Sequence, residues 1–305
     1  MPITVAEYYG QRTDLDMPVI EPVTGRSPCP FADGKDCPKT FKSDQNPVCA
    51  VRKEDGTFWI VCPDRLCTTK KDIPLSHYQR GILIDVARHI FDKSLTPDEV
   101  FVKREVLVNV ANTKYHADYI MTYRGGHSPL TPGPDRVILE MQGGGETSNT
   151  GTMTSIVNAW KNNPDRSNAD LRQRSSASPL ITNAWRRQQE QFIVKGNIAM
   201  QTWKGYGIAF CVGTLLFDHL KDKLRFDTMP DLRTHNWTLA LIAFREDESA
   251  PVRPGPVPLV VDESRLFFTN YQTFVHALIN QGLPSPRAFS GTYLSLNNEE
   301  TNFSI

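Results

Sequence analysis

Apolar positions recur along the middle of the chain with two different periods, and each period predicts a different kind of element. Between residues 77 and 92 the spacing is helical, and Pro97 closes the segment. One face of this helix collects four apolar residues, Leu83, Ala87, Ile90 and Phe91. The pattern therefore predicts a helix that packs against a core through this face.

Strict alternation follows this helix and predicts strands. Over residues 101 to 110 the alternation places four valines on one side, Val102, Val106, Val108 and Val110. Two more strands are predicted, at 117–123 and 136–142, with a turn rich in Gly and Pro (125–135) between them. We therefore expect a meander of neighbouring strands.

The remaining pattern completes a mixed α/β prediction. A second helical stretch covers 181–203, apolar strands are expected at about 206–217 and 237–244, and a Pro-rich tail starts at 250. Residues 1 to 70 show little periodicity and many Pro and Cys residues, which favours a small region stapled by a metal. The predicted organisation is a region 1–72 followed by an α/β core at 73–305.

The strand that ends in "VILEMQGGG" carries polar residues at a place where a buried strand has none. Because side chains alternate between faces, Glu140 and Gln142 project from one face, while Leu139 and Met141 occupy the other. One interpretation is an edge strand with one solvated face. The other is a functional site at the end of a buried strand, next to three glycines that would let a ligand approach closely.

Composition restricts the classes of protein to consider. The chain has 305 residues, 39% of them hydrophobic, and its 34 Lys and Arg balance 34 Asp and Glu. No global charge therefore favours nucleic acid or a membrane, although a neutral total can hide a basic face. The longest nearly apolar run, 208–217, is too short to span a bilayer, and no signal pattern opens the chain. We expect a protein of a reducing cytoplasm.

Five of the six cysteines fall between residues 29 and 67, whereas Cys211 lies alone in an apolar stretch and is expected in the core. Disulfides are unfavourable in a reducing compartment, so thiolates grouped in loops beside prolines suit a tetrahedral metal site better than unrelated thiols. Sulfur ligation of this kind admits zinc or iron.

Positive charge and aromatic residues gather in 160–205. Eight Lys or Arg stand there against three acids, together with Trp160, Trp185, Phe192 and Trp203. Such a segment favours a face that contacts nucleic-acid phosphates. The alternative is a solvated helix whose aromatic residues lie in the core.

Two acids in neighbouring strands suggest metal chemistry. Asp118 precedes Glu140 by one turn of the meander, and Glu105 lies in the strand before it. Adjacent carboxylates repel one another unless a cation lies between them, and Mg²⁺ prefers oxygen ligands and keeps waters that can attack a phosphodiester.

In order along the chain, these features resemble the NotI and EagI family of type II restriction endonucleases. The resemblance runs to about residue 245 and rests on nine motifs, which are "YYGQR", "CPF" at Cys29, "CPK" at Cys37, "VCAV" at Cys49, "VCPDR" at Cys62, "ADY" at Asp118, "VILEMQ", "NAWRRQQEQF" and "HNWTLALIAF". It implies the PD-(D/E)XK nuclease fold, a mixed sheet flanked by helices, with Gln142 at the place usually taken by Lys.

The resemblance also implies residue roles. Asp118 and Glu140 would hold the catalytic Mg²⁺, Gln142 would position or polarise the attacking water, and Glu105 would support the site. A structural iron ion, with zinc as the alternative, would be held by Cys29, Cys37, Cys49 and Cys62. Cys67 has no counterpart in the family pattern, so it is either a spare thiol or a substitute ligand.

The family acts as homodimers that cut GC-rich palindromes in double-stranded DNA. A palindrome requires two-fold protein symmetry. Arg186 and Arg187 are expected to contact DNA, at phosphates or at guanine edges. A cognate DNA methyltransferase is expected as a functional partner in a prokaryotic cytoplasm, and not as a bound one. Two rival hypotheses are a modification-dependent or repair nuclease of the same fold, and a non-catalytic four-cysteine DNA-binding protein.

Overall fold

A computed structural model describes residues 2–23, 25–41, 45–68, 70–110, 112–125, 132–142, 145–202, 206–282 and 285–304. At its centre lies a six-stranded sheet with the order β10-β9-β8-β7-β6-β5. The strands are β5 (Val100–Val110), β6 (Thr113–Tyr123), β7 (Arg136–Gln142), β8 (Tyr206–Gly213), β9 (Leu239–Glu246) and β10 (Leu259–Thr269). The three central strands β7, β8 and β9 run parallel, whereas the outer pairs are antiparallel. The predicted mixed α/β core is confirmed.

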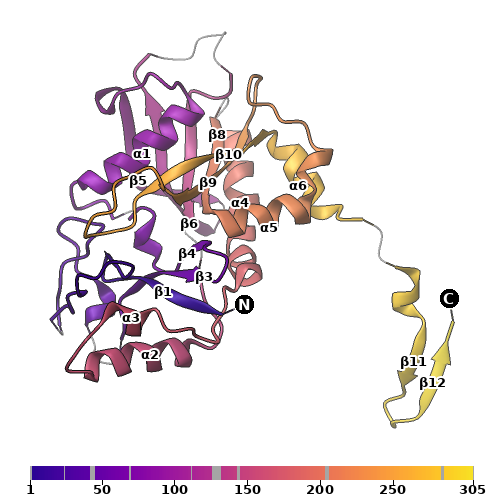
Figure 1. The fold of residues 1–305 in the computed structure, drawn as a ribbon. Helices are drawn as coiled ribbons and strands as arrows, with labels where there is room; N and C mark the ends of the chain where they lie inside the picture. Colours follow the sequence, from indigo (N-terminus) through magenta and orange to yellow (C-terminus); the bar gives the residue numbers. More distant parts are fainter. Residues whose placement is uncertain are drawn as a thin grey trace.

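Helices cover both faces of this sheet (Figure 1). Helix α1 (His77–Ile90) packs on one face, and α4 (Ile181–Thr202), α5 (Thr214–Leu224) and α6 (Tyr271–Ile279) pack on the other. The division follows strand alternation, since Leu139 and Met141 belong to the core under α1 while Ile138 belongs to the core under α4. The helix predicted at 77–92 starts with a capping box between Ser76 and Gln79.

Two details of the predicted elements are wrong. The strand expected to run to residue 217 ends at Gly213, and α5 begins at Thr214, because a continuous apolar run suits a buried helix as well as a buried strand. The four valines of β5 do not share one side. Val102 packs on the α1 side and Val106 on the α4 side, because Glu105, at φ 47°, interrupts the alternation between them.

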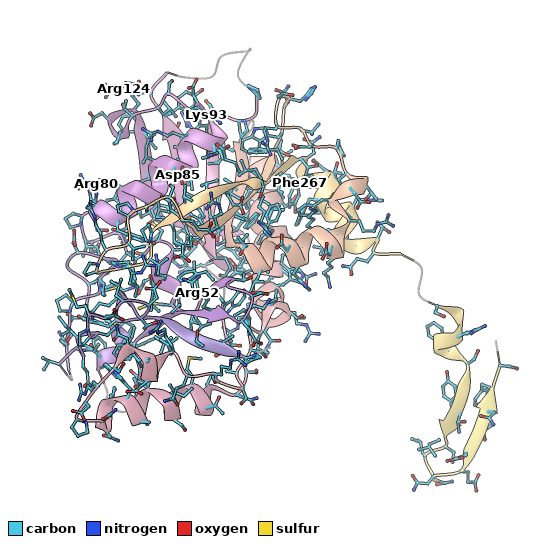
Figure 2. All side chains as sticks on the ribbon, viewed as in Figure 1. Arg52, Arg80, Asp85, Lys93, Arg124 and Phe267 are labelled. Atoms are coloured by element: carbon cyan, nitrogen blue, oxygen red, sulfur yellow. The ribbon has the colours of Figure 1, made fainter. Side chains whose placement is uncertain are left out.

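Residues near the N-terminus form a second sheet of order β2-β1-β3-β4. Its strands are β1 (Ile3–Tyr8), β2 (Gln11–Arg12), β3 (Val48–Lys53) and β4 (Phe58–Ile60). Helices α2 (Thr150–Asn162) and α3 (Asn168–Leu171) share its core, so a segment from the middle of the chain completes the N-terminal region. Arg52 of β3 (Figure 2) pairs with Glu246 of β9 at 2.7 Å and links the two sheets.

Short 3₁₀ helices connect several of these elements. They are η1 (Pro38–Thr40), η2 (Pro63–Arg65), η3 (Pro97–Glu99), η4 (Phe226–Thr228) and η5 (Pro286–Phe289). The Pro-rich tail predicted from 250 also contains β10, α6 and a terminal hairpin of β11 (Gly291–Leu294) and β12 (Glu300–Phe303), which lies apart from the body in Figure 1. Within the described part of the chain, none of the helices has the length and apolar character needed to cross a membrane.

Candidate functional site

The polar strand end that the sequence singled out lies in the middle of the sheet. Strand β7 pairs with β6 on one side and β8 on the other, and Glu140 is only 4% exposed, so the edge-strand interpretation is wrong. Continuing the β6–β7 register by one pair places Asp118 opposite Glu140. The Met141 backbone N–H donates to Asp118 Oδ2 at 2.8 Å, which fixes one carboxylate beside the other strand.

A lysine that sequence reasoning did not connect with this pair completes it. Lys195 of α4, 2% exposed, donates from Nζ to Glu140 Oε2 at 2.6 Å. The two residues are 55 positions apart, so no spacing rule could join them. Only the packing of α4 over the sheet brings this cation to the carboxylates. The one general signal in the sequence is the clustering of basic residues in 160–205, which is compatible with a phosphate-contacting face and with a solvated helix.

The surroundings of Asp118 and Glu140 make it unfavourable for both carboxyls to be ionised together. Burial, with the neighbouring charge of Asp118, raises the pKa of Glu140 to about 8, and Lys195 offsets only part of that rise. Burial likewise raises the pKa of Asp118. Among the described residues, nothing forms a hydrogen bond with Glu140 Oε1, although this atom is buried. An unpartnered carboxylate oxygen beside a second acid suits a metal ligand.

Glu105 lies next to the pair without joining it. The register of β5 with β6 places Glu105 opposite Asp118, and its charge contributes to the raised pKa of Asp118. Its carboxylate, however, accepts the backbone N–H of Lys71 at 3.3 Å. The structure therefore supports a role for Glu105 in the surroundings of the two acids and gives it no direct contact with them.

Gln142 lies one step beyond Glu140 on the same face, as predicted. Its amide oxygen accepts a hydrogen bond from Gln188 of α4 at 2.7 Å. Like Glu140, it is therefore oriented by a residue of α4. The glycines 143 and 144 that follow it lie outside the described residues, so the close approach expected there stays a prediction.

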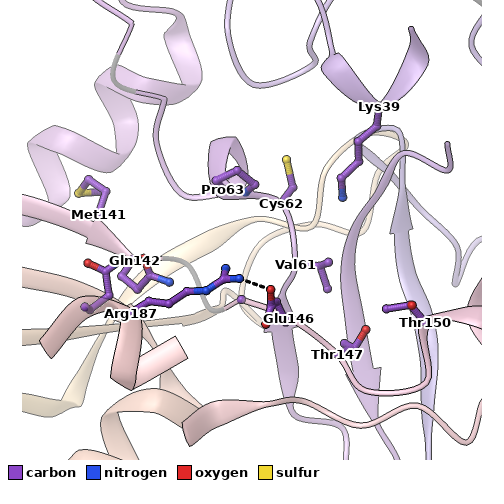
Figure 3. Close-up of a pocket in the computed structure, with 12 residues that line it drawn as sticks. Lys39, Val61, Cys62, Pro63, Met141, Gln142, Glu146, Thr147, Thr150 and Arg187 are labelled. Atoms are coloured by element: carbon purple, nitrogen blue, oxygen red, sulfur yellow. Dashed lines mark hydrogen bonds and ion pairs between the residues drawn. The ribbon is translucent and has the colours of Figure 1, made fainter. Parts of the chain in front are cut away.

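Two adjoining cavities open beside these residues. A cavity of about 390 Å³ is lined by Asp118, Glu140, Gln142, Gln191 and Lys195 among others. A second one, of about 550 Å³, extends from Gln142 to Lys39 and Cys62 (Figure 3). Both have Met141, Gln142, Arg187 and Gln188 in their walls. The two cavities thus form one hollow, with the acids in the wall of the first, Cys62 in the wall of the second, and Pro63 of the cysteine-rich region in both.

The two arginines expected to contact DNA differ in their surroundings. Arg187 lines both cavities and forms an ion pair with Glu146 (Figure 3). Arg186 is exposed and lines neither cavity. Of the aromatic residues in the basic segment, Trp160, Trp185 and Phe192 are buried in the core, which confirms the core alternative for them, while residues 203 and 204 lie outside the described part.

Four of the cysteines gather in one buried cluster, Cys29, Cys37, Cys49 and Cys62. Burial raises the pKa of each thiol, to about 12 for Cys29, and backbone N–H groups act in the opposite direction. These donors are Phe31 for Cys29, Lys39 for Cys37, Gly10 for Cys49 and Asp64 for Cys62. Each sulfur therefore has a donor that would stabilise a thiolate, as ligand sulfurs commonly have.

Cys67 and Cys211 stand outside that cluster, in the core under α1. Cys67 Sγ lies 3.2 Å from the Tyr119 hydroxyl and has no place among the other four. Cys211 is completely buried in β8, as expected for a core residue. This arrangement favours Cys67 as the spare thiol.

Within the described ranges, no three His, Cys, Asp or Glu side chains stand close enough to hold a metal ion as they are placed. The predicted iron or zinc site and the predicted Mg²⁺ site therefore stay predictions. No protein-family model matches the chain, and no curated protein matches it either.

Proposed function

We propose that this chain is a Mg²⁺-dependent, site-specific endonuclease of double-stranded DNA, a type II restriction enzyme with a PD-(D/E)XK core. One observation carries the proposal. Two neighbouring carboxylates, Asp118 and Glu140, are held inside a mixed sheet beside a cavity, and one buried oxygen of Glu140 has no partner among the described residues. Two such neighbouring acids are costly to ionise together, and a cation bound between them would offset that cost.

The reaction is the hydrolysis of a phosphodiester. Water adds to phosphorus, one phosphorus–oxygen bond breaks, and the products are a phosphate monoester and a hydroxyl. Asp118 and Glu140 would hold Mg²⁺, which, when bound, lowers the pKa of its water and stabilises charge on the phosphate. Gln142, fixed by Gln188, would orient the attacking water by hydrogen bonding, and Glu105 would add negative potential around the pair.

The two adjoining cavities suggest where DNA would lie. They place Arg187 and Lys39 along the hollow between the acids and the cysteine cluster. Cationic side chains in such a position neutralise phosphates and fix the register of the duplex, without themselves reading sequence. Arg186, outside the hollow, would contact more distant phosphates.

The cysteine cluster would be a structural metal site. Cys29, Cys37, Cys49 and Cys62 supply four sulfurs, the number that tetrahedral iron or zinc needs, and each sulfur has a backbone donor nearby. Cys62 lines the second cavity, which fits a role of the cluster in shaping the surface that reads DNA. A homodimer, with one such surface per protomer, would match a GC-rich palindrome, and a cognate methyltransferase would protect host DNA.

The rival DNA-binding hypothesis treats Asp118 and Glu140 as solvated strand residues, whereas Glu140 is 4% exposed and paired with Lys195. Cleavage of unmethylated phage DNA in the presence of Mg²⁺ tests the proposal. We expect discrete fragments that EDTA or Glu140→Ala abolishes, with Glu263→Gln, an exposed acid far from the cavities, as the matched control. DNA binding without fragments would contradict it, and fragments from methylated DNA alone would favour the modification-dependent hypothesis.

A further inference from the structure

Strands β6 and β7 provide two acids and an amide, Asp118, Glu140 and Gln142, and none of the three carries positive charge. Hydrolysis of a phosphodiester accumulates negative charge on the phosphate oxygens, and fixed cations in a closed site stabilise that charge. Lys195 is the buried cation of this cavity, and it comes from a different element, α4. We propose that Lys195 is a catalytic residue whose ammonium contacts the phosphate during cleavage; this inference rests on the proposed nuclease function.

The structure holds Lys195 in a fixed place. Phe192, one turn earlier on α4, is 2% exposed in the core under the helix. Gly196, the next residue, lies so close to Tyr271 of α6 that a Cβ there would come within 2.3 Å of the ring. The Tyr271 hydroxyl donates to the carbonyl of Ile193 on the same helix. Contacts on several sides therefore set the depth and rotation of α4, and with them the place of the lysine.

Lys195 keeps hydrogen-bonding capacity for a ligand. An ammonium group carries three donors, and Glu140 Oε2 is the one acceptor that the described residues give it. The cavity of about 390 Å³ that Lys195 lines with Asp118 and Glu140 is the space that the reacting phosphate would enter. One N–H would thus hold Glu140 while another reaches a phosphate oxygen.

A purely structural ion pair differs from this one in the hydrogen bonding of its carboxylate. In such a pair the buried carboxylate has both oxygens satisfied, because an unmet acceptor in the core is costly. Glu140 has one oxygen on Lys195 and one without a hydrogen-bond partner among the described residues, and the side chains of both Glu140 and Lys195 line the cavity. The pair is therefore arranged to serve a ligand as well as the fold.

The test separates charge from hydrogen bonding at position 195. Lys195→Met removes both, and Lys195→Gln keeps a donor for Glu140 without the charge. For both variants we expect turnover of cognate DNA at saturating Mg²⁺ to fall about 10²-fold or more. We expect Lys195→Arg to keep more turnover than either. Lys93→Met, which removes an exposed lysine paired with Glu263 (Lys93 is labelled in Figure 2), should match the wild type.

Metal affinity provides the second measurement. Titration calorimetry with Mn²⁺ should show that Lys195→Met and Lys195→Gln bind the ion at least as tightly as the wild type, since a repelling charge has been removed. Wild-type turnover in the Gln variant, or a loss that more Mg²⁺ restores, would overturn the catalytic role alone. A wild-type protein that cuts no DNA and binds no Mn²⁺ would overturn the proposed function and this role together.

Discussion

Two buried ion pairs in this protein are built in opposite ways. Arg65 and Glu7 are both completely buried, and both oxygens of Glu7 are used, by Arg65 Nε at 2.5 Å and by Arg65 Nη2 and the Val257 N–H at 2.7 Å. Lys195 and Glu140 are almost as deeply buried, yet Glu140 Oε1 has no partner among the described residues and a second acid lies beside it.

The first pair is enclosed by the protein, whereas the second borders a cavity. Arg65 also donates to the Tyr78 hydroxyl and packs over the Phe31 ring, so the pair joins the cysteine-rich region to α1 and to the loop before β10. All its polar groups are satisfied by protein. The Lys195–Glu140 pair borders a cavity, and one buried Glu140 oxygen has no hydrogen-bond partner among the described residues, so this pair is the candidate for a ligand site.

The largest effect is expected from removing the charge of Glu140 in the Lys195–Glu140 pair. Glu140→Gln keeps the shape of the side chain and removes the charge that would bind Mg²⁺, so DNA cleavage should fall by about 10³-fold or more, equivalent to the several kcal/mol that a bound metal contributes. Rates of plasmid nicking measure this. Circular dichroism should remain that of the wild type, and retained cleavage would remove Glu140 from the catalytic site.

Removing the cation of the Arg65–Glu7 pair should lower the stability of the protein instead. Arg65→Met leaves the Glu7 carboxylate buried without its cation and should lower the free energy of unfolding by about 3–5 kcal/mol. Arg52→Met is the matched control, because the Arg52–Glu246 pair is only partly buried and should contribute about 1 kcal/mol or less. Urea denaturation compares the two variants. Equal losses would mean that burial does not distinguish these pairs.

Cysteine variants test whether the four-cysteine cluster binds a metal ion. Cys29→Ser should reduce bound iron or zinc from about one ion per chain to a small fraction, because a tetrahedral site needs four ligands. Cys67→Ser should keep the metal, since Cys67 lies against Tyr119 in a different core. Elemental analysis of the purified variants reports the outcome. Loss of metal in Cys67→Ser and its retention in Cys29→Ser would reverse our ligand assignment.

The smallest effect is expected at the two exposed arginines of α4, the helix that carries Lys195. Arg187→Ala should weaken DNA binding about tenfold and lower the salt slope by about one, because one phosphate contact is lost. Arg186→Ala, outside both cavities, should weaken it less. Binding without Mg²⁺, measured by fluorescence anisotropy at several salt concentrations, decides the order. A larger effect at Arg186 would place the DNA on another face of α4.

Much of the fold and half of the candidate site follow from the sequence. The periods predicted α1, the meander β5 to β7 and α4, and alternation placed Glu140 and Gln142 together on one face, away from Leu139 and Met141. These features depend on neighbours a few residues apart, so local patterns report them. The α5 segment was missed because an apolar run is compatible with both periods.

What only the tertiary structure decided involves residues far apart in the chain. Whether β7 is central or at an edge depends on β8, which lies more than sixty residues later and pairs in parallel with it. The partner of Glu140 is Lys195, carried there by a helix whose position is set by packing against the sheet and α6. The grouping of five cysteines favoured a shared metal site, and the family resemblance implied Cys29, Cys37, Cys49 and Cys62, but only folding separated these four from Cys67. Sequence patterns record which face a side chain occupies, whereas long-range packing determines what it meets there.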